Sequence, residues 1–133
     1  MKIIITGGDG FCGWPTSLHL SRVGHEILIL DNLSRRMIDI ELNTDLYTNI
    51  CSIQERIQTW NSINETPIQF KMINIAEEYF QLKSILQEFN PDTIIHYSWQ
   101  ILWNLGIIAL VRAGEHIQHC SSPALIRCNS RYT

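Results

Sequence analysis

The stretch Ile3-Ile4-Ile5-Thr6-Gly7-Gly8-Asp9-Gly10-Phe11-Cys12-Gly13 at the start of the chain decides the fold. Its apolar, β-branched beginning predicts a buried strand, and the residues from Trp14 to Leu20 predict a helix. Glycine lets the backbone adopt a positive φ and approach a pyrophosphate closely, while the helix start offers N–H groups to an anion. The order of strand, glycine turn and helix therefore favours a dinucleotide site over a plain structural turn.

A second apolar run, from Glu26 to Leu30, predicts a strand that ends in Asp31, 18 residues after Gly13. An acid about 20 residues past the glycines accepts hydrogen bonds from ribose hydroxyls in dinucleotide-binding folds, although an exposed Asp can also simply cap a turn. The acid repels a 2′-phosphate and so favours NAD over NADP. The basic pair Arg35-Arg36 could instead neutralise such a phosphate. We give the acid more weight because it ends the strand.

The rest of residues 1–97 alternates between strand and helix patterns. Between the second strand and Cys51 the sequence leaves a loop or a short helix open. The further elements expected are a helix from Ser52 to Trp60 with a capping box of Ser52 and Glu55, a strand Ile68 to Ile73, a helix Glu77 to Phe89 and a strand Thr93 to Tyr97. The alternation predicts an α/β fold with a Rossmann-like parallel sheet and flanking helices, ordered 3-2-1-4 and truncated after about four strands.

The composition bounds the function classes. The 133 residues are 45% hydrophobic, enough for one core, and the net charge of −3 provides no basic patch, so we expect no nucleic-acid partner. Cys12, Cys51, Cys120 and Cys128 form no CxxC pair, which argues against a zinc ribbon or a disulfide framework and fits a reducing, cytoplasmic compartment. The first strand begins too early for a leader to precede it, and the apolar run from Trp99 to Val111 is too short to span a bilayer, so we expect no membrane partner.

Several groups of residues carry a resemblance to a known family. They are Gly7-Gly8-Asp9-Gly10-Phe11-Cys12-Gly13-Trp14, Leu18-His19-Leu20-Ser21, Asp31-Asn32-Leu33-Ser34-Arg35-Arg36, and Ser52-Ile53 with Arg56-Ile57 and Trp60. Over about residues 1–97 the chain resembles the UDP-sulfoquinovose synthases, extended short-chain dehydrogenase/reductases of the NAD-dependent epimerase/dehydratase family. Cys12-Gly13-Trp14 distinguishes it from general nucleotide-sugar epimerases. The resemblance implies an NAD-dependent enzyme that makes UDP-sulfoquinovose from UDP-glucose and sulfite, in a family whose members form homodimers.

The resemblance also implies a set of cofactor-binding residues. Along the pyrophosphate it places Gly7, Gly10, Phe11, Cys12 and Gly13, and around the adenosine it places Asp31, Asn32 and Arg35 or Arg36. Family members carry Asp-Ile or Asp-Val after the third strand, with the carboxylate near the adenine, whereas this chain has Asn74-Ile75. An amide still donates and accepts hydrogen bonds, so we expect weaker cofactor binding rather than none.

The resemblance ends after Tyr97, and of the family's next segment only Gln100 matches. The catalytic Thr and the Tyr-x-x-x-Lys pair of the family belong to later elements, so we assign no catalytic residue in this chain. Tyr79 and Lys83 have the Tyr-x-x-x-Lys spacing, but they fall in the helix between the third and fourth strands, where we attribute the spacing to chance.

The tail from residue 98 to 133 matches no pattern of the family. His116, His119, Cys120 and Cys128 could be read as zinc ligands, but an ordinary polar tail is the favoured interpretation and we assign no metal site. We expect Ile107 to Val111 to add a helix or strand at the sheet edge, and Ser121 to Thr133 to be disordered.

We therefore divide the chain into an NAD-binding Rossmann half-domain, residues 1–97, and an unrecognised tail, residues 98–133, as expected for a truncated or frame-shifted product. Three hypotheses follow. The chain is the N-terminal NAD-binding part of a UDP-sulfoquinovose synthase-like enzyme and inactive by itself, or a non-catalytic nucleotide-binding module. Alternatively it has no function, and its half-sheet exposes an apolar edge where a fifth strand should pair.

Overall fold

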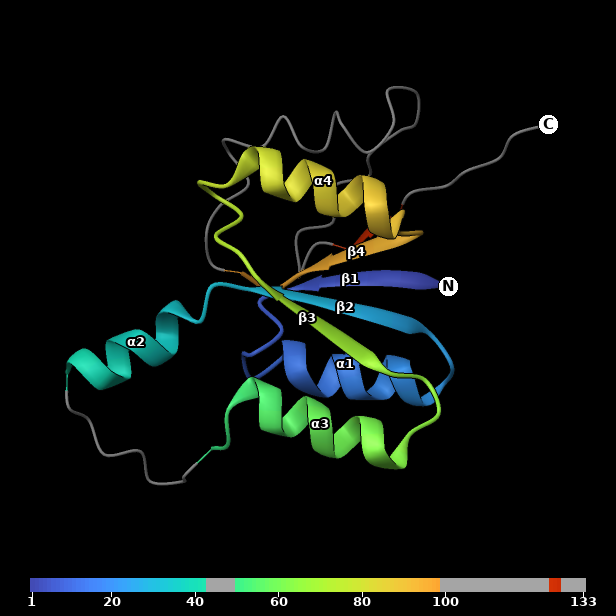
Figure 1. The fold of residues 1–133 in the computed structure, drawn as a ribbon, viewed down its shortest axis with the longest axis horizontal. Helices are drawn as coiled ribbons and strands as arrows, with labels where there is room; N and C mark the ends of the chain where they lie inside the picture. Colours follow the sequence, from blue (N-terminus) through green and yellow to red (C-terminus); the bar gives the residue numbers. More distant parts are fainter. Residues whose placement is uncertain (43–49, 99–124, 128–133) are drawn as a thin grey trace.

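The structure, a computed structural model, describes residues 1–42, 50–98 and 125–127. Four parallel strands form its centre: β1 (Lys2–Thr6), β2 (Glu26–Asp31), β3 (Ile68–Met72) and β4 (Thr93–His96). Helices α1 (Gly13–Arg22) and α3 (Ile53–Ile63) cover one face of the sheet, and α4 (Tyr79–Phe89) covers the other (Figure 1). Helix α2 (Ser34–Glu41) extends beyond the carboxyl ends of the strands and buries none of its residues.

The strand order is β3-β2-β1-β4, which confirms the predicted order 3-2-1-4 and the Rossmann-like α/β class. A fifth strand, β5 (Leu125–Arg127), pairs antiparallel with β4. The expectation that Ser121 to Thr133 is disordered is therefore wrong for these three residues, and β5 occupies the edge of β4 that the hypothesis of a chain without function leaves exposed. An open strand edge presents a row of N–H and C=O groups that a short apolar segment can pair with.

The core consists of two layers, one on each face of the sheet. Ile3, Ile5 and Ile29 face α1 and α3, while Ile4 and Leu28 face α4; all are at most 4% exposed. Because helices cover both faces, successive residues of a strand are all buried, which explains why these strands are uninterrupted apolar runs in the sequence.

The predicted helices are all present, but their ends differ: α1 continues to Arg22 rather than Leu20, and α3 continues to Ile63 rather than Trp60. Ser52 and Glu55 form the predicted capping box at the start of α3. Helix α4 begins at Tyr79 rather than at Glu77, because the amides of Glu77 and Glu78 bond to the carbonyl of Asn74 in a turn after β3. For the region between β2 and Cys51 the sequence did not distinguish a loop from a short helix; the structure has helix α2 there, which ends at Glu41.

Within the described ranges no helix is long and apolar enough to cross a bilayer. In the same ranges no group of three or more His, Cys, Asp or Glu side chains is arranged to hold a metal ion. The segment Ile107 to Val111 and the tail residues His116, His119, Cys120 and Cys128 lie outside the described residues.

Candidate functional site

The glycine turn joins the carboxyl end of β1 to the start of α1. Gly7 adopts φ +73°, and a Cβ built on Gly13 would lie 2.2 Å from the Gly7 carbonyl oxygen. At Gly10 such a Cβ would lie 3.2 Å from the same oxygen. The turn is thus too tight for any side chain at position 13, and its backbone folds back on itself as a close approach to a phosphate requires.

The start of α1 leaves backbone donors available. The amides of Trp14 and Thr16 bond to the carbonyls of Gly10 and Cys12. In the part of the chain that the structure describes, no backbone acceptor is found for the amides of Phe11, Cys12 or Gly13. Phe11 is 88% exposed and Cys12 is also exposed, whereas Gly13 is buried. Such a helix start binds anions through its N–H groups and its dipole.

Asp31 connects the glycine turn to the turn that follows β2. Its Oδ2 accepts a hydrogen bond from the Asp9 amide at 3.0 Å, and its Oδ1 accepts one from the Leu33 amide at 2.8 Å. Leu33 adopts φ +56°, and the next turn is closed by Asn32, whose Oδ1 accepts from the Ser34 amide at 3.1 Å. A carboxylate has about four lone-pair sites, so Asp31 keeps capacity to accept from ribose hydroxyls.

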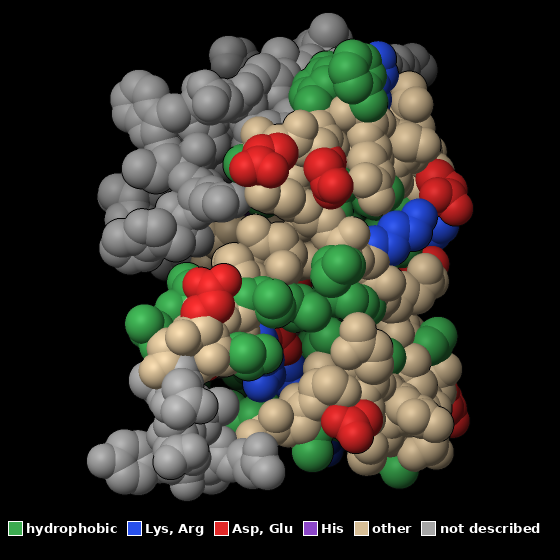
Figure 2. All heavy atoms as spheres, turned by 60° about the vertical axis from the view of Figure 1, so that its left-hand side comes forward, with side chains coloured by type: hydrophobic (Ala, Val, Ile, Leu, Met, Phe, Trp, Pro, Cys, Tyr) green, Lys and Arg blue, Asp and Glu red, His purple; other side chains and the backbone are tan. Residues whose placement is uncertain are grey.

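Asp9 lies at the centre of a cluster of charges beside this turn. Its carboxylate, 8% exposed, accepts from Arg36 Nε at 2.6 Å and Arg36 Nη2 at 3.2 Å, and also from Arg56 Nη2. The guanidinium of Arg56 stands over the Trp14 ring, 4.5 Å from its centroid. Figure 2 views the molecule from the α2 side, where side chains of both charges meet in a recess between hydrophobic ones.

The electrostatics of this cluster follow from its contacts. The hydrogen bond from Arg36 to Asp9 raises the pKa of Arg36, whereas burial lowers the pKa of Arg56. Both side chains stay cationic at neutral pH because free arginine titrates above about pH 12. Arg56 Nε is buried and has no hydrogen-bond partner among the described residues. Two guanidinium groups thus lie beside the carboxylates of Asp9 and Asp31, and the carboxylate of Asp39 also acts on Arg36.

The remaining residues predicted for the cofactor lie at the margins of this arrangement. Arg35 is exposed at the start of α2. Asn74 follows β3, and its Oδ1 accepts from the Ala76 amide at 3.2 Å. The side chain of Ile75 is buried in the core layer under α4 and does not reach solvent. The chance Tyr-x-x-x-Lys pair sits on α4, where Tyr79 packs edge-on against Phe80 at 5.4 Å.

The structure therefore brings the glycine turn, Asp31, Asn32 and Arg36 together at the carboxyl ends of β1 and β2. Sequence reasoning did not assign Asp9 or Arg56 to the site. Asp9 belongs to the glycine turn and Arg56 to the helix predicted from Ser52 to Trp60, but the two residues are 47 positions apart and no local pattern links them.

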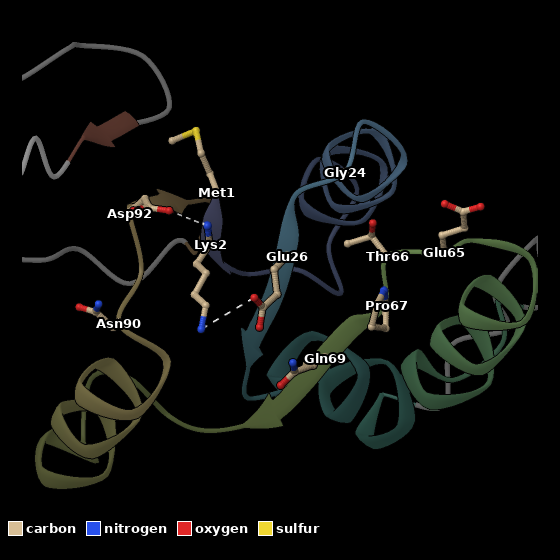
Figure 3. Close-up of a pocket in the computed structure, with 10 residues that line it drawn as sticks. All are labelled: Met1, Lys2, Gly24, Glu26, Glu65, Thr66, Pro67, Gln69, Asn90 and Asp92. Atoms are coloured by element: carbon tan, nitrogen blue, oxygen red, sulfur yellow. Dashed lines mark hydrogen bonds and ion pairs between the residues drawn. The ribbon is translucent and has the colours of Figure 1, made fainter.

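A second depression lies at the opposite edge of the sheet, at the amino ends of the strands (Figure 3). It has a volume of about 660 Å³ and is lined by Met1, Lys2, Gly24, Glu26, Glu65, Thr66, Pro67, Gln69, Asn90 and Asp92. There Lys2 pairs with Glu26 at 3.8 Å, and its amide donates to Asp92 at 2.7 Å. Ligands of open parallel sheets bind at the carboxyl ends, so the candidate site is the glycine turn rather than this depression.

Comparison with known proteins shows that about three quarters of the chain is similar to nucleotide-sugar enzymes. No protein-family model matches the sequence. The chloroplastic UDP-sulfoquinovose synthase of Spinacia oleracea is 39% identical over 99 residues, which cover 74% of this chain and 20% of that protein. A UDP-glucose 4-epimerase of Neisseria meningitidis serogroup B is 49% identical over 97 residues, covering 73% of this chain and 24% of that protein.

The fold has a solved counterpart. The crystal structure of a UDP-glucose 4-epimerase from Stenotrophomonas maltophila, with bound NAD and formylated UDP-arabinopyranose, superposes with a TM-score of 0.52 at 22% identity, covering 74% of this chain and 24% of that one. This likeness shows the fold alone. The chain spans about a fifth of the length of the spinach relative. Over about three quarters of its length, the chain is similar to UDP-sulfoquinovose synthases, of which it covers a fifth to a quarter, as the resemblance in the sequence indicated.

Proposed function

We propose that this chain is the N-terminal NAD-binding part of a UDP-sulfoquinovose synthase-like enzyme, which forms UDP-sulfoquinovose from UDP-glucose and sulfite. The observation that carries the proposal is the glycine turn. Gly13 leaves no room for a side chain, and the amides of Phe11, Cys12 and Gly13 have no backbone acceptor among the described residues. An anionic ligand held by backbone groups fits this geometry.

The residues present fit a dinucleotide. The three amides and the positive end of α1 would hold the pyrophosphate, and Asp31 with Asn32 would accept from the adenosine ribose. Asn74 lies one strand further along the same edge, on the side where the family places the adenine. When bound, NAD would supply a hydride acceptor for C4 of the sugar and return the hydride at the end of the reaction.

We propose that the 133-residue chain is inactive by itself. We assign no proton acceptor for a sugar hydroxyl among the described residues. The carboxylates of Asp9 and Asp31 are engaged with arginines and backbone amides. At the end of β4, His96 Nδ1 lies 2.6 Å from Thr6 Oγ1, and the Tyr97 hydroxyl lies 3.1 Å from Thr16 Oγ1. The family's catalytic Thr and Tyr-x-x-x-Lys pair would come from segments beyond the resemblance. Assembly as a homodimer and a cytoplasmic location are part of the same proposal.

Titration of the chain with NADH, followed by nucleotide fluorescence, tests the cofactor site. We expect saturable binding, and we expect Asp31→Ala to weaken it by about 1–3 kcal/mol, or roughly 5- to 150-fold in Kd. Glu41→Gln, which removes an exposed acid on α2, is the matched control and should bind as wild type does. Absence of saturable binding to wild type would overturn the proposal.

A turnover assay tests the proposed inactivity. The chain is incubated with NAD, UDP-glucose and sulfite, and UDP-sulfoquinovose is sought by mass spectrometry. We expect no product; its formation would show that the chain contains a catalytic base after all.

One observation favours a second candidate, a non-catalytic nucleotide-binding module. Strand β5 pairs with β4, so the described sheet does not end in an open β4 edge. A module that holds only the adenosine half of the ligand should bind ADP about as tightly as NADH, whereas the enzyme part should prefer the complete dinucleotide. Competition of ADP against bound NADH separates the two.

A further inference from the structure

The Asp9 side chain is only 8% exposed and lies between the two arginines of the candidate site. The Asp9 amide donates to Asp31 Oδ2, and its carboxylate receives both guanidinium groups of the cluster. From this geometry we propose that Asp9 sets the cofactor preference of the site by holding Arg36 and Arg56, so that a dinucleotide with a free ribose 2′-hydroxyl is accepted and one with a 2′-phosphate is rejected. The inference rests on the proposed function.

Arg36 is the side chain that a 2′-phosphate would need. It lies five residues after Asp31, close to where an arginine accommodates the 2′-phosphate in NADP-binding folds. A guanidinium binds phosphate through a fork of parallel N–H groups. In this chain two of those groups, Nε and Nη2, already donate to Asp9, at 2.6 and 3.2 Å. The fork formed by Nε and Nη2 is therefore occupied, and Nη1 donates to the Ile50 carbonyl at 3.4 Å.

Arg56 is fixed in place by Asp9 and Trp14. Its Nη2 donates to Asp9, and the guanidinium lies over the indole at 4.5 Å from its centroid. Its side chain is only 15% exposed, so it cannot swing out toward a ligand without losing both contacts. Arg56 thus adds positive charge that Asp9 must balance.

Negative charge surrounds the guanidinium groups of the cluster. The carboxylates of Asp9, Asp31 and Asp39 all act on Arg36, and Asp9 also pairs with Arg56, so a dianionic phosphate gains no net attraction. Replacing Asp9 by asparagine removes one negative charge beside the ribose and loosens three N–H groups, while the side-chain shape is kept. Both changes favour a 2′-phosphate, and a free 2′-hydroxyl gains nothing from either.

The test measures Kd for NADH and for NADPH by nucleotide fluorescence with the full chain, at one fixed salt concentration because exposed charges are screened. We expect the ratio of the NADPH to the NADH dissociation constant to fall at least about tenfold in Asp9→Asn. In Asp9→Asn/Arg36→Gln that fall should be lost. In Asp9→Asn/Arg22→Gln, which removes a cation at the far end of α1, it should persist.

The outcomes separate this inference from the proposed function. If wild type binds neither nucleotide, both fail. If wild type binds NADH and the ratio in Asp9→Asn is unchanged, the inference alone is overturned. Should Asp9→Asn fail to fold by circular dichroism, Arg36→Lys in the wild-type background decides, because it removes the guanidinium fork and keeps the charge. An Arg36 already held by Asp9 predicts an unchanged ratio, and a ratio that rises severalfold overturns the proposal.

Discussion

Replacing Asp31 by alanine should destabilise the chain even without any ligand. The substitution removes the acceptor of the Asp9 amide at 3.0 Å and of the Leu33 amide at 2.8 Å. A buried donor left without a partner costs about 1–3 kcal/mol. Both bonds are only partly buried, so water can replace part of each, and we expect about 2–4 kcal/mol for the pair. Leu33 adds to the effect because its φ of +56° is unfavourable for a side chain and Asp31 Oδ1 holds it there.

Urea unfolding followed by circular dichroism measures this loss. With a slope of about 2 kcal/mol per molar urea, the midpoint should fall by about 1–2 M. Asp31→Asn keeps one acceptor oxygen and should lose roughly half as much. The control Glu41→Gln removes an exposed acid and should stay within about 0.5 kcal/mol of wild type. A midpoint for Asp31→Ala equal to that of the control would refute the idea that this carboxylate joins the two turns.

Two further substitutions test the turn and the start of α3. Gly13→Ala places a Cβ 2.2 Å from the Gly7 carbonyl oxygen and should abolish saturable NADH binding. In the control Gly24→Ala the new Cβ meets nothing within 4 Å, so a thermal melt should show a loss of only about 1–2 kcal/mol, caused by the positive φ at that position. Normal NADH binding by Gly13→Ala would contradict the tight turn. Ser52→Ala removes the capping box and should cost about 1 kcal/mol in urea unfolding at neutral pH. Hydrogen bonds from Ser52 lower the pKa of Glu55, so the part contributed by the Ser52 hydroxyl is present above the ordinary carboxyl pKa and lost as pH falls through the lowered one. The bond from the Glu55 amide to Ser52 Oγ does not titrate. The difference between wild type and Ser52→Ala should therefore narrow in acid without vanishing, and a difference that does not change with pH would count against this account.

The sequence predicted the parts of the fold that depend on neighbours along the chain. Ile3 to Ile5 and Ile27 to Ile29 are buried on both faces of the sheet, so their apolar runs were visible as strands. The capping box of Ser52 and Glu55 is complete within four residues. The start of α4 was misplaced by two residues because it depends on the Asn74 carbonyl, which captures the amides that a longer helix would use.

Contacts between distant segments were not predictable in this way. The pairing of β5 with β4 joins residues about 30 positions apart, and three residues carry too little pattern to indicate a strand. Arg56 meets Asp9 across 47 positions, through the packing of α3 beside α1. Sequence reasoning gave Asp9 no role within the glycine turn, because nothing near it shows that two cations arrive there from other elements.

The choice between NAD and NADP shows why such contacts matter. In the sequence, Asp31 favours NAD and the pair Arg35-Arg36 opposes it, and only the position of Asp31 at the end of its strand gives the acid more weight. In the structure these residues do not act independently, since Arg36 is engaged by Asp9, and Asp9 is itself tied to Asp31 through its amide. A basic residue near the ribose therefore predicts phosphate binding only when its N–H groups are free. On the inference above, the choice between NAD and NADP depends on Asp9, which occupies the N–H groups of Arg36, more than on Asp31.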